Sequence, residues 1–142
     1  MRQASGGSIA AVSDHPALRV LVYSDDALTR RKVVSALGTR PHPDLEIECI
    51  EVATAPVVIR HLDDGDVDLA VLDGESTPVG GMGLAKQLTD EIDDCPPIIV
   101  LTGRADDAWL AKWSRASAAV PHPIDPIQLT QEVVALLRAA RG

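Results

Sequence analysis

The sequence predicts a doubly wound α/β fold in which five parallel strands alternate with five helices. Three short and nearly continuous apolar runs predict strands covered on both faces, at residues 18–23 (LRVLVY), 67–73 (VDLAVLD) and 96–101 (PPIIVL). Helical patterns lie between these runs, and this alternation is typical of a parallel sheet with helical crossovers. At 142 residues, the chain is long enough for one such domain.

Two further segments complete the expected sheet. Residues 45–51 (LEIECIE) alternate strictly between apolar and polar side chains, which predicts an edge strand with one wetter face. Residues 117–120 (SAAV) predict a short fifth strand that ends at Val120, because Pro121 lacks a backbone donor and is poor material for a strand interior.

Helix-start and helix-stop residues frame the segments between the strands. Helices are expected at about residues 26–37, 54–65, 84–92, 105–116 and 126–140. The first begins at Asp26, a typical N-cap residue. The last has the clearest start, since Asp125 caps it, Pro126 takes the first helical position and Gln128 completes a capping box.

Charge and composition exclude several classes of partner. The chain has 13 Lys and Arg against 21 Asp and Glu, a net charge of −8, which argues against nucleic acid and against an anionic membrane surface. No apolar run approaches the ~18 residues that span a bilayer. Residues 1–16 lack the apolar core of a signal peptide and are expected to form a flexible tail before one domain at 17–142, in a cytoplasmic protein.

Polar side chains follow the carboxyl ends of the expected strands. Asp25, Asp73, Thr102 and His122 follow four strands, and in a sheet of order 2-1-3-4-5 they converge at one edge. Neighbouring carboxylates repel one another unless a cation lies between them, and oxygen ligands suit Mg²⁺. Such a cation also lets a carboxylate attack a phosphoryl group. Asp26 is a further candidate ligand, although by itself it is more typical of a helix cap.

Nearly the whole chain resembles the receiver domain of two-component response regulators. The resemblance rests on LRVLVYSDDALTRRKVVSALG, VDLAVLDGESTPVGGMGLAKQL, PPIIVLTGRADD and VPHPIDPIQL. It implies a flavodoxin-like (βα)5 fold with strand order 2-1-3-4-5. It also implies that Asp73 is the phospho-acceptor, that Asp25 binds Mg²⁺ together with Asp73, and that Thr102 is the switch hydroxyl.

The sequence departs from the family at three functional positions. Ser24 replaces the first acidic residue, so one carboxylate of the metal site is missing and Mg²⁺ binding is expected to be weak. His122 replaces a lysine, which is a permanent cation, whereas imidazole is shorter and titrates near neutral pH. Ala119 replaces the switch aromatic residue. The resemblance also implies a cis peptide between His122 and Pro123.

These departures favour one of two receiver functions. The favoured function is an atypical single-domain receiver, a pseudo-receiver or accessory subunit of a larger complex, which acts through protein contacts with weak or no phosphorylation. The alternative is an active phosphorelay receiver, phosphorylated on Asp73 by a sensor histidine kinase with Mg²⁺. In either case the chain is not an enzyme beyond self-phosphorylation from a phosphodonor and autodephosphorylation at Asp73. A flavodoxin-like electron carrier is disfavoured, because SDDALT places two carboxylates where a phosphate would bind.

Trp109 and Trp113 form the candidate partner-binding surface. They lie four residues apart and so share one face of the expected fourth helix, in a chain without Phe and with one Tyr. Indoles are enriched among the residues that dominate interface energy. The alternative is that one or both pack inward against the fifth strand and fill the space left by Ala119.

Overall fold

The computed structural model describes residues 17–76, 79–103 and 114–141. In chain order, its elements are β1 (Leu18–Tyr23), α1 (Ala27–Leu37), β2 (Ile47–Val52), α2 (Ala55–Asp64), β3 (Leu69–Asp73), α3 (Gly81–Glu91), β4 (Ile98–Thr102), β5 (Ala118–Pro121) and α5 (Pro126–Arg141). The strands form one parallel sheet of order β2-β1-β3-β4-β5, as predicted.

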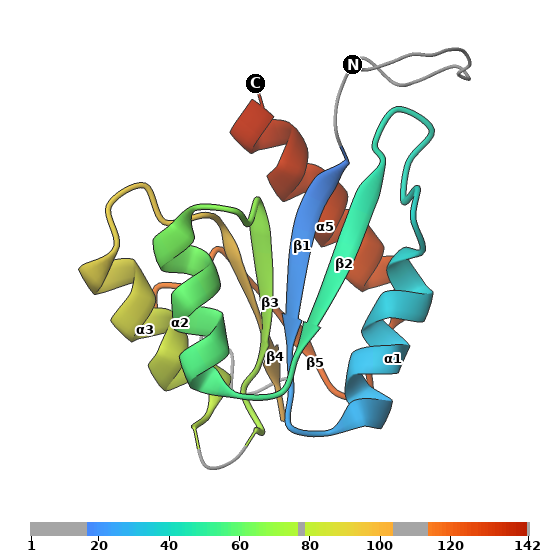
Figure 1. The fold of residues 1–142 in the computed structure, drawn as a ribbon. Helices are drawn as coiled ribbons and strands as arrows, with labels where there is room; N and C mark the ends of the chain where they lie inside the picture. The colour runs from blue at the N-terminus through green and yellow to red at the C-terminus, as the bar shows by residue number, and fades with distance from the viewer. Residues whose placement is uncertain (1–16, 77–78, 104–113, 142) are drawn as a thin grey trace.

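Helices cover both faces of the sheet (Figure 1). Helices α1 and α5 lie on one face, and α2 and α3 lie on the other. This separation divides the core into two clusters, which meet at the sheet because successive side chains of a strand point to opposite faces. On β1, Val20 and Val22 join the α1–α5 cluster, whereas Leu21 and Tyr23 join the α2–α3 cluster.

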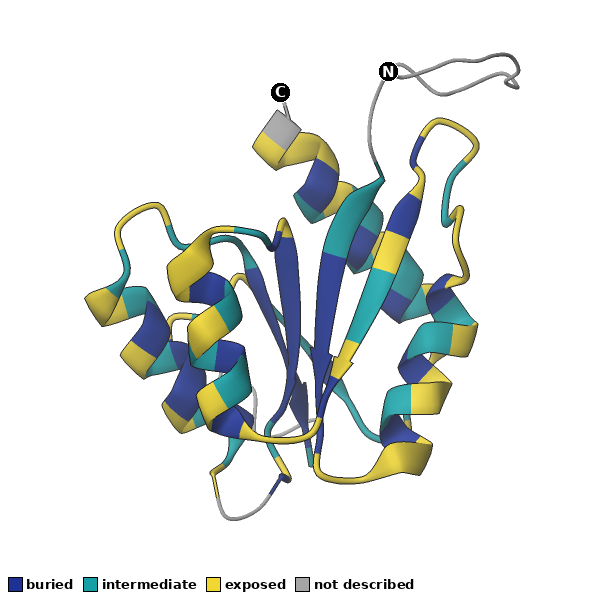
Figure 2. Ribbon diagram, viewed as in Figure 1, coloured by how far each residue is buried: buried dark blue, intermediate teal, exposed yellow. Residues whose placement is uncertain are grey.

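The central strands are buried along most of their length (Figure 2), which explains their continuous apolar sequences. All five residues of β3 and all five of β4 are buried. Strand β2 lies at the edge of the sheet, as predicted, and includes exposed Glu48 and Glu51. No helix in the described part of the chain is long and apolar enough to cross a membrane.

The N-caps of α1 and α5 are the residues that the sequence predicted. Asp26 is the N-cap of α1, and its side chain accepts a hydrogen bond from the Leu28 N–H. Asp125 Oδ1 accepts hydrogen bonds from the backbone N–H groups of Ile127 and Gln128 at the start of α5.

The bounds of β1 match the predicted range, whereas those of β2, β3, β4 and β5 differ from their predicted ranges by one or two residues. Strand β5 continues through Pro121, which pairs with Thr102, instead of ending at Val120. The proline is tolerated because β5 is an edge strand, where a missing N–H need not break the sheet. Trp109, Trp113 and the expected tail at 1–16 lie outside the described residues.

Candidate functional site

The candidate site is a hollow at the carboxyl ends of the strands. Its volume is about 240 Å³, and it is lined by Asp25, Asp26, Thr29, Asp73, Glu75, Gly103 and His122. The loops after β1, β3, β4 and β5 therefore meet at this edge, as parallel topology requires. Of the predicted site residues, Asp25, Asp26, Asp73 and His122 line the hollow, whereas Thr102 is not among its lining residues and is buried at the end of β4.

Asp73 is a buried carboxylate whose two oxygens both contact protein groups. The Ser24 Oγ–H donates to Asp73 Oδ2 at 2.8 Å. The Glu75 backbone N–H donates to Oδ1 at 2.9 Å, and His122 Nε2 lies 3.3 Å from the same oxygen. Only 4 % of the Asp73 side chain is exposed, so these contacts replace much of the hydration that the charge has lost.

Ser24 takes its orientation from the loop between β1 and α1. Its Oγ accepts a hydrogen bond from the Asp26 N–H at 3.0 Å, which leaves the hydroxyl proton for Asp73. Its carbonyl oxygen accepts from Arg30 Nη1 at 2.6 Å, while Arg30 Nε pairs with Glu51 on β2 at 3.2 Å. Arg30 thus fastens this loop to the neighbouring strand, a role that the sequence analysis missed.

The two aspartates after β1 have different surroundings. Asp26 uses Oδ1 to accept from the Leu28 N–H and Oδ2 to accept from the Thr29 hydroxyl, both at 3.0 Å. This confirms the capping interpretation, and both oxygens already have partners. Asp25 lines the hollow with an exposed position, and its backbone N–H donates to Ser76 Oγ at 3.0 Å.

Tyr23, the last residue of β1, is hydrogen-bonded to the loop before α3. Its hydroxyl donates to the Val79 carbonyl oxygen at 2.7 Å. Burial raises the pKa of the Tyr23 phenol above its usual value, the negative charges of Asp25 and Asp73 raise it further, and a hydrogen bond with Ser76 opposes the shift. The phenol therefore keeps the proton that it donates to Val79.

His122 reaches Asp73 from the loop after β5. Its backbone N–H donates to the Thr102 carbonyl oxygen at 2.8 Å, which extends the pairing of β4 and β5 by one bond. The His122–Pro123 peptide bond is cis, as the resemblance implied. The imidazole is 27 % exposed, so it covers one side of the nearly buried carboxylate.

Glu75 and Gly103 complete the rim, and the sequence analysis singled out neither. A Cβ placed on Gly103 would lie 2.8–2.9 Å from the Glu75 carboxyl group, so glycine leaves the room that this side chain occupies. The clue in the sequence was spacing alone, since Glu75 follows Asp73 by two residues and Gly103 follows Thr102 directly.

The oxygen atoms at this edge are of the kind that Mg²⁺ prefers, but few are available. Asp25 and Asp73 line the same hollow and would be the residues that hold the ion, and Glu75 also lines it. Ser24 contributes a neutral hydroxyl, and the Asp26 oxygens cap α1. Within the described residues, no group of three or more His, Cys, Asp or Glu side chains is arranged to hold a metal ion. The oxygen ligands at this site are therefore of the type that Mg²⁺ prefers, but too few of them are charged.

Comparison with known proteins identifies the family. The chain is 65 % identical, over 124 residues, to a Mycobacterium tuberculosis H37Rv protein named "uncharacterized response regulatory protein Rv3143", covering 87 % of this chain and 93 % of that one. The protein MT3230 of strain CDC 1551, which bears the same description, matches with the same identity and coverage. The chain belongs to the response regulator family. A receiver domain of this family is typically no catalytic enzyme apart from its phosphotransfer chemistry. No family model matches the chain.

Solved structures agree with the receiver fold. A signal receiver domain of a LuxO repressor protein from Vibrio parahaemolyticus has a TM-score of 0.75 at 19 % identity, covering 89 % of this chain and 94 % of that one. A CheY-like response regulator receiver domain protein from Methanospirillum hungatei has a TM-score of 0.71 at 20 % identity, covering 89 % and 98 %. At these identities the likeness concerns the fold of the receiver domain alone.

Proposed function

We propose that this receiver domain acts mainly through protein–protein contacts and that phosphorylation of Asp73 is slow or absent. One observation carries the proposal: both carboxylate oxygens of Asp73 contact groups of the protein itself, at distances of 2.8–3.3 Å. These three contacts engage three of the roughly four lone-pair sites of the carboxylate, so attack on a phosphoryl group and coordination of Mg²⁺ both compete with them. Breaking a buried hydrogen bond to a charged group costs about 1.5–3 kcal/mol, which adds to the barrier.

The composition of the site supports the same proposal. Ser24 stabilises the Asp73 charge with a neutral hydroxyl, where a second carboxylate would call for a metal ion. His122 contacts Oδ1 with a group that is charged only when protonated. The site therefore keeps one conformation without a bound cation. This suits a cytoplasmic accessory subunit whose partner complex recognises a single conformation of the domain.

A second candidate function is an active phosphorelay receiver. A response regulator implies a histidine kinase partner, and the 240 Å³ hollow beside Asp73 offers space for a phosphoryl group. In that function Asp73 is the acceptor, Asp25 and Asp73 hold Mg²⁺, and Thr102 and His122 bind phosphoryl oxygens.

A phosphodonor separates the two functions. The protein is incubated with acetyl phosphate and Mg²⁺, and its intact mass is followed over time. We expect a slow and incomplete gain of one phosphoryl group, and none in Asp73→Asn. A rapid stoichiometric gain that Asp73→Asn abolishes would contradict the proposal and establish the phosphorelay receiver.

The proposed partner surface includes Trp109 and Trp113, which remain a prediction because they lie outside the described residues. The proposal extends this surface from the region of the two tryptophans to β5 and α5. No nucleic acid is expected as a partner, because the net charge of the chain is −8.

A further inference from the structure

The contact between His122 and Asp73 has the spacing of two ligands of one tetrahedral metal ion. His122 Nε2 lies 3.3 Å from Asp73 Oδ1, which is longer than the usual N–H···O hydrogen bond of about 2.7–3.2 Å. Two donors at about 2.0–2.1 Å from a tetrahedral ion lie roughly 3.3–3.4 Å apart. Neighbouring donors of an octahedral Mg²⁺ ion are closer, at about 2.9 Å. A tetrahedral ion between the two atoms therefore needs no change in their separation.

Both atoms have a lone pair to offer such an ion. Asp73 Oδ1 accepts the Glu75 backbone N–H at 2.9 Å, which uses one of its two lone pairs, and Ser24 bonds to the other oxygen, Oδ2. In a neutral imidazole one nitrogen bears the proton and the other bears a lone pair. A His122 ring protonated at Nδ1 thus presents the lone pair of Nε2 to Asp73 Oδ1. The ring is 27 % exposed, so an ion can reach it from solvent.

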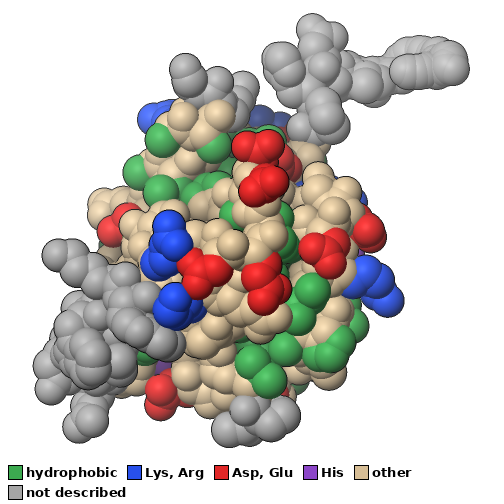
Figure 3. Space-filling model, turned by 90° about the vertical axis from the view of Figure 1, so that its left-hand side faces the viewer, with side chains coloured by type: hydrophobic (Ala, Val, Ile, Leu, Met, Phe, Trp, Pro, Cys, Tyr) green, Lys and Arg blue, Asp and Glu red, His purple; other side chains and the backbone are tan. Residues whose placement is uncertain are grey.

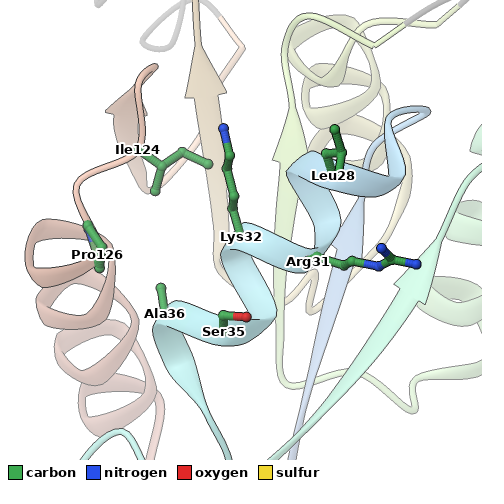
Figure 4. Close-up of a pocket in the computed structure, with 7 residues that line it drawn as sticks. All are labelled: Leu28, Arg31, Lys32, Ser35, Ala36, Ile124 and Pro126. Atoms are coloured by element: carbon green, nitrogen blue, oxygen red, sulfur yellow. The ribbon is translucent and has the colours of Figure 1, made fainter.

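The lining of the hollow at Asp73 attracts cations. It contains four acidic residues and, within the described part of the chain, no lysine or arginine. Basic side chains lie elsewhere. A second hollow of about 540 Å³, between α1 and the start of α5, has Arg31 and Lys32 in its lining (Figure 4). On the side of the molecule that carries α3, basic side chains lie beside carboxylates (Figure 3), and Asp90 pairs there with Lys86 at 2.8 Å.

The other His–Asp contacts in the described residues differ from this one, because each includes an arginine. His42 and His61 both lie beside an aspartate. Arg138 lies 3.0 Å from the aspartate that contacts His42, and Arg19 lies 3.6 Å from the aspartate that contacts His61. No lysine or arginine within the described ranges forms such a pair with Asp73. A metal ion would thus meet a competing cation at the first two carboxylates and none at the third.

Glu75 is the side chain best placed to complete a set of ligands. Its carboxyl group lies against Gly103, the residue that follows β4, and β4 lies between β3 and β5 in the sheet. Glu75 is therefore on the same side of Asp73 as His122, whereas Asp25 follows β1 on the opposite side. Two ligands are in position, and the exposed Glu75 carboxylate becomes the third by a side-chain rotation. Water then takes the fourth position of a tetrahedral ion.

We infer that Asp73, His122 and Glu75 form a binding site for a divalent transition-metal ion of the Zn²⁺ type, on the β5 side of the carboxylate. Imidazole nitrogen is a ligand for zinc, whereas Mg²⁺ selects oxygen ligands. The hydrogen bonds to Asp73 from Ser24 and from the Glu75 N–H orient the carboxylate, as groups around a metal ligand commonly do. The inference goes beyond the proposed function and does not depend on it.

The test is a titration of the full chain, freed of metal with a chelator. Zn²⁺ and Mg²⁺ are added separately and followed by isothermal titration calorimetry. We expect one equivalent of Zn²⁺ to bind at least ~10-fold more tightly than Mg²⁺. In ¹⁵N spectra of the imidazole rings, the Nε2 signal of His122 should shift with the first equivalent of Zn²⁺, before those of His42 and His61.

Variants assign the ion to this site. His122→Asn should weaken Zn²⁺ binding at least ~10-fold and leave Mg²⁺ binding unchanged, because only zinc uses the imidazole. Glu75→Gln should weaken Zn²⁺ binding at least ~3-fold, since a charged ligand is lost. His61→Ala is the matched control: it removes another histidine that contacts an aspartate, and Zn²⁺ affinity should not change. Melting temperatures in chelator check that each variant is folded, and the ring spectrum of wild type tests the site without any variant.

Three results would overturn the inference: no Zn²⁺ binding at about 100 µM, an affinity that His122→Asn leaves unchanged, or a His122 Nε2 signal that stays in place when Zn²⁺ binds. Its failure is separable from that of the proposed function, because the titration contains no phosphodonor. Rapid mass gain with acetyl phosphate and Mg²⁺, in a protein that also binds Zn²⁺ through His122, would refute the proposed function alone.

Discussion

Replacing Ser24 with aspartate tests whether the Ser24–Asp73 hydrogen bond takes the place of a metal ion. Ser24 is fully buried, and its hydroxyl lies 2.8 Å from Asp73 Oδ2. The substitution removes a hydrogen bond to a charged group, which costs about 2 kcal/mol. It also adds a carboxylate at roughly 4 Å, where two like charges repel by ~4 kcal/mol at an effective dielectric constant of about 20. Proton uptake relieves part of this repulsion, so we expect the free energy of unfolding to fall by about 3–5 kcal/mol.

Mg²⁺ should reverse much of this loss. With Ser24→Asp the site gains the charged ligand that it lacks, and an ion at 100 times its Kd contributes about 2.7 kcal/mol. The wild-type protein, with its weak site, should gain much less at the same concentration. The measurement is thermal unfolding in chelator and then in rising MgCl2, where 1 kcal/mol corresponds to roughly 3–5 °C for a domain of this size. The variant should therefore melt ~10 °C or more below wild type in chelator, and Mg²⁺ should close much of the gap.

Two controls isolate the cause. Ser24→Ala removes the hydrogen bond without adding charge, so it should be destabilised and should not gain a response to Mg²⁺. Ser35→Asp places a carboxylate on an exposed serine of α1, outside the Asp73 hollow, and should behave like wild type. If Ser24→Asp has the melting temperature of wild type in chelator, or if Mg²⁺ does not raise its melting temperature, the reasoning about this hydrogen bond is refuted.

Two further outcomes follow from the contacts of individual side chains. His122→Lys should raise the rate of mass gain with acetyl phosphate by about tenfold or more, because it puts a permanent cation beside Asp73 Oδ1. The double variant His122→Lys with Asp73→Asn is the control and should gain no phosphoryl group. An unchanged rate in His122→Lys would contradict this expectation. Burial, together with the negative charge of Glu51, raises the pKa of the Cys49 thiol from 9.0 to about 11, so its thiolate fraction at pH 8 is about 100-fold lower than that of an unperturbed thiol. Iodoacetamide should modify Cys49 slowly at pH 8 and about tenfold faster for each pH unit up to 10, as followed by peptide mass mapping. Rapid modification of the folded protein at pH 8 would contradict that expectation.

The sequence predicted the fold because its signals are local. The continuous apolar run at 18–23 gave β1 its bounds, and Asp26 and Asp125 marked the starts of α1 and α5. The gathering of Asp25, Asp73 and His122 at one edge also followed from sequence, because parallel strands place their carboxyl ends together.

The hydrogen bonds within the site could not be predicted in the same way. In the sequence, Ser24 indicates only that an acidic residue of the family is missing. Its hydrogen bond to Asp73 Oδ2 depends on the conformation of the loop, which directs the hydroxyl toward that oxygen. The Glu75 N–H contact with Asp73 depends on the turn after β3, which no side-chain pattern reports. The pairing of Pro121 was missed because the rule against proline in strands was applied without regard to its place on a sheet edge.

The cap of α1 belongs to the Asp73 site as well as to the helix. Asp26 lines the hollow at Asp73, and its two oxygens accept hydrogen bonds from the Leu28 N–H and the Thr29 hydroxyl. A cation that recruited Asp26 would have to draw it away from the first turn of α1, so cation binding through this residue would weaken the start of the helix.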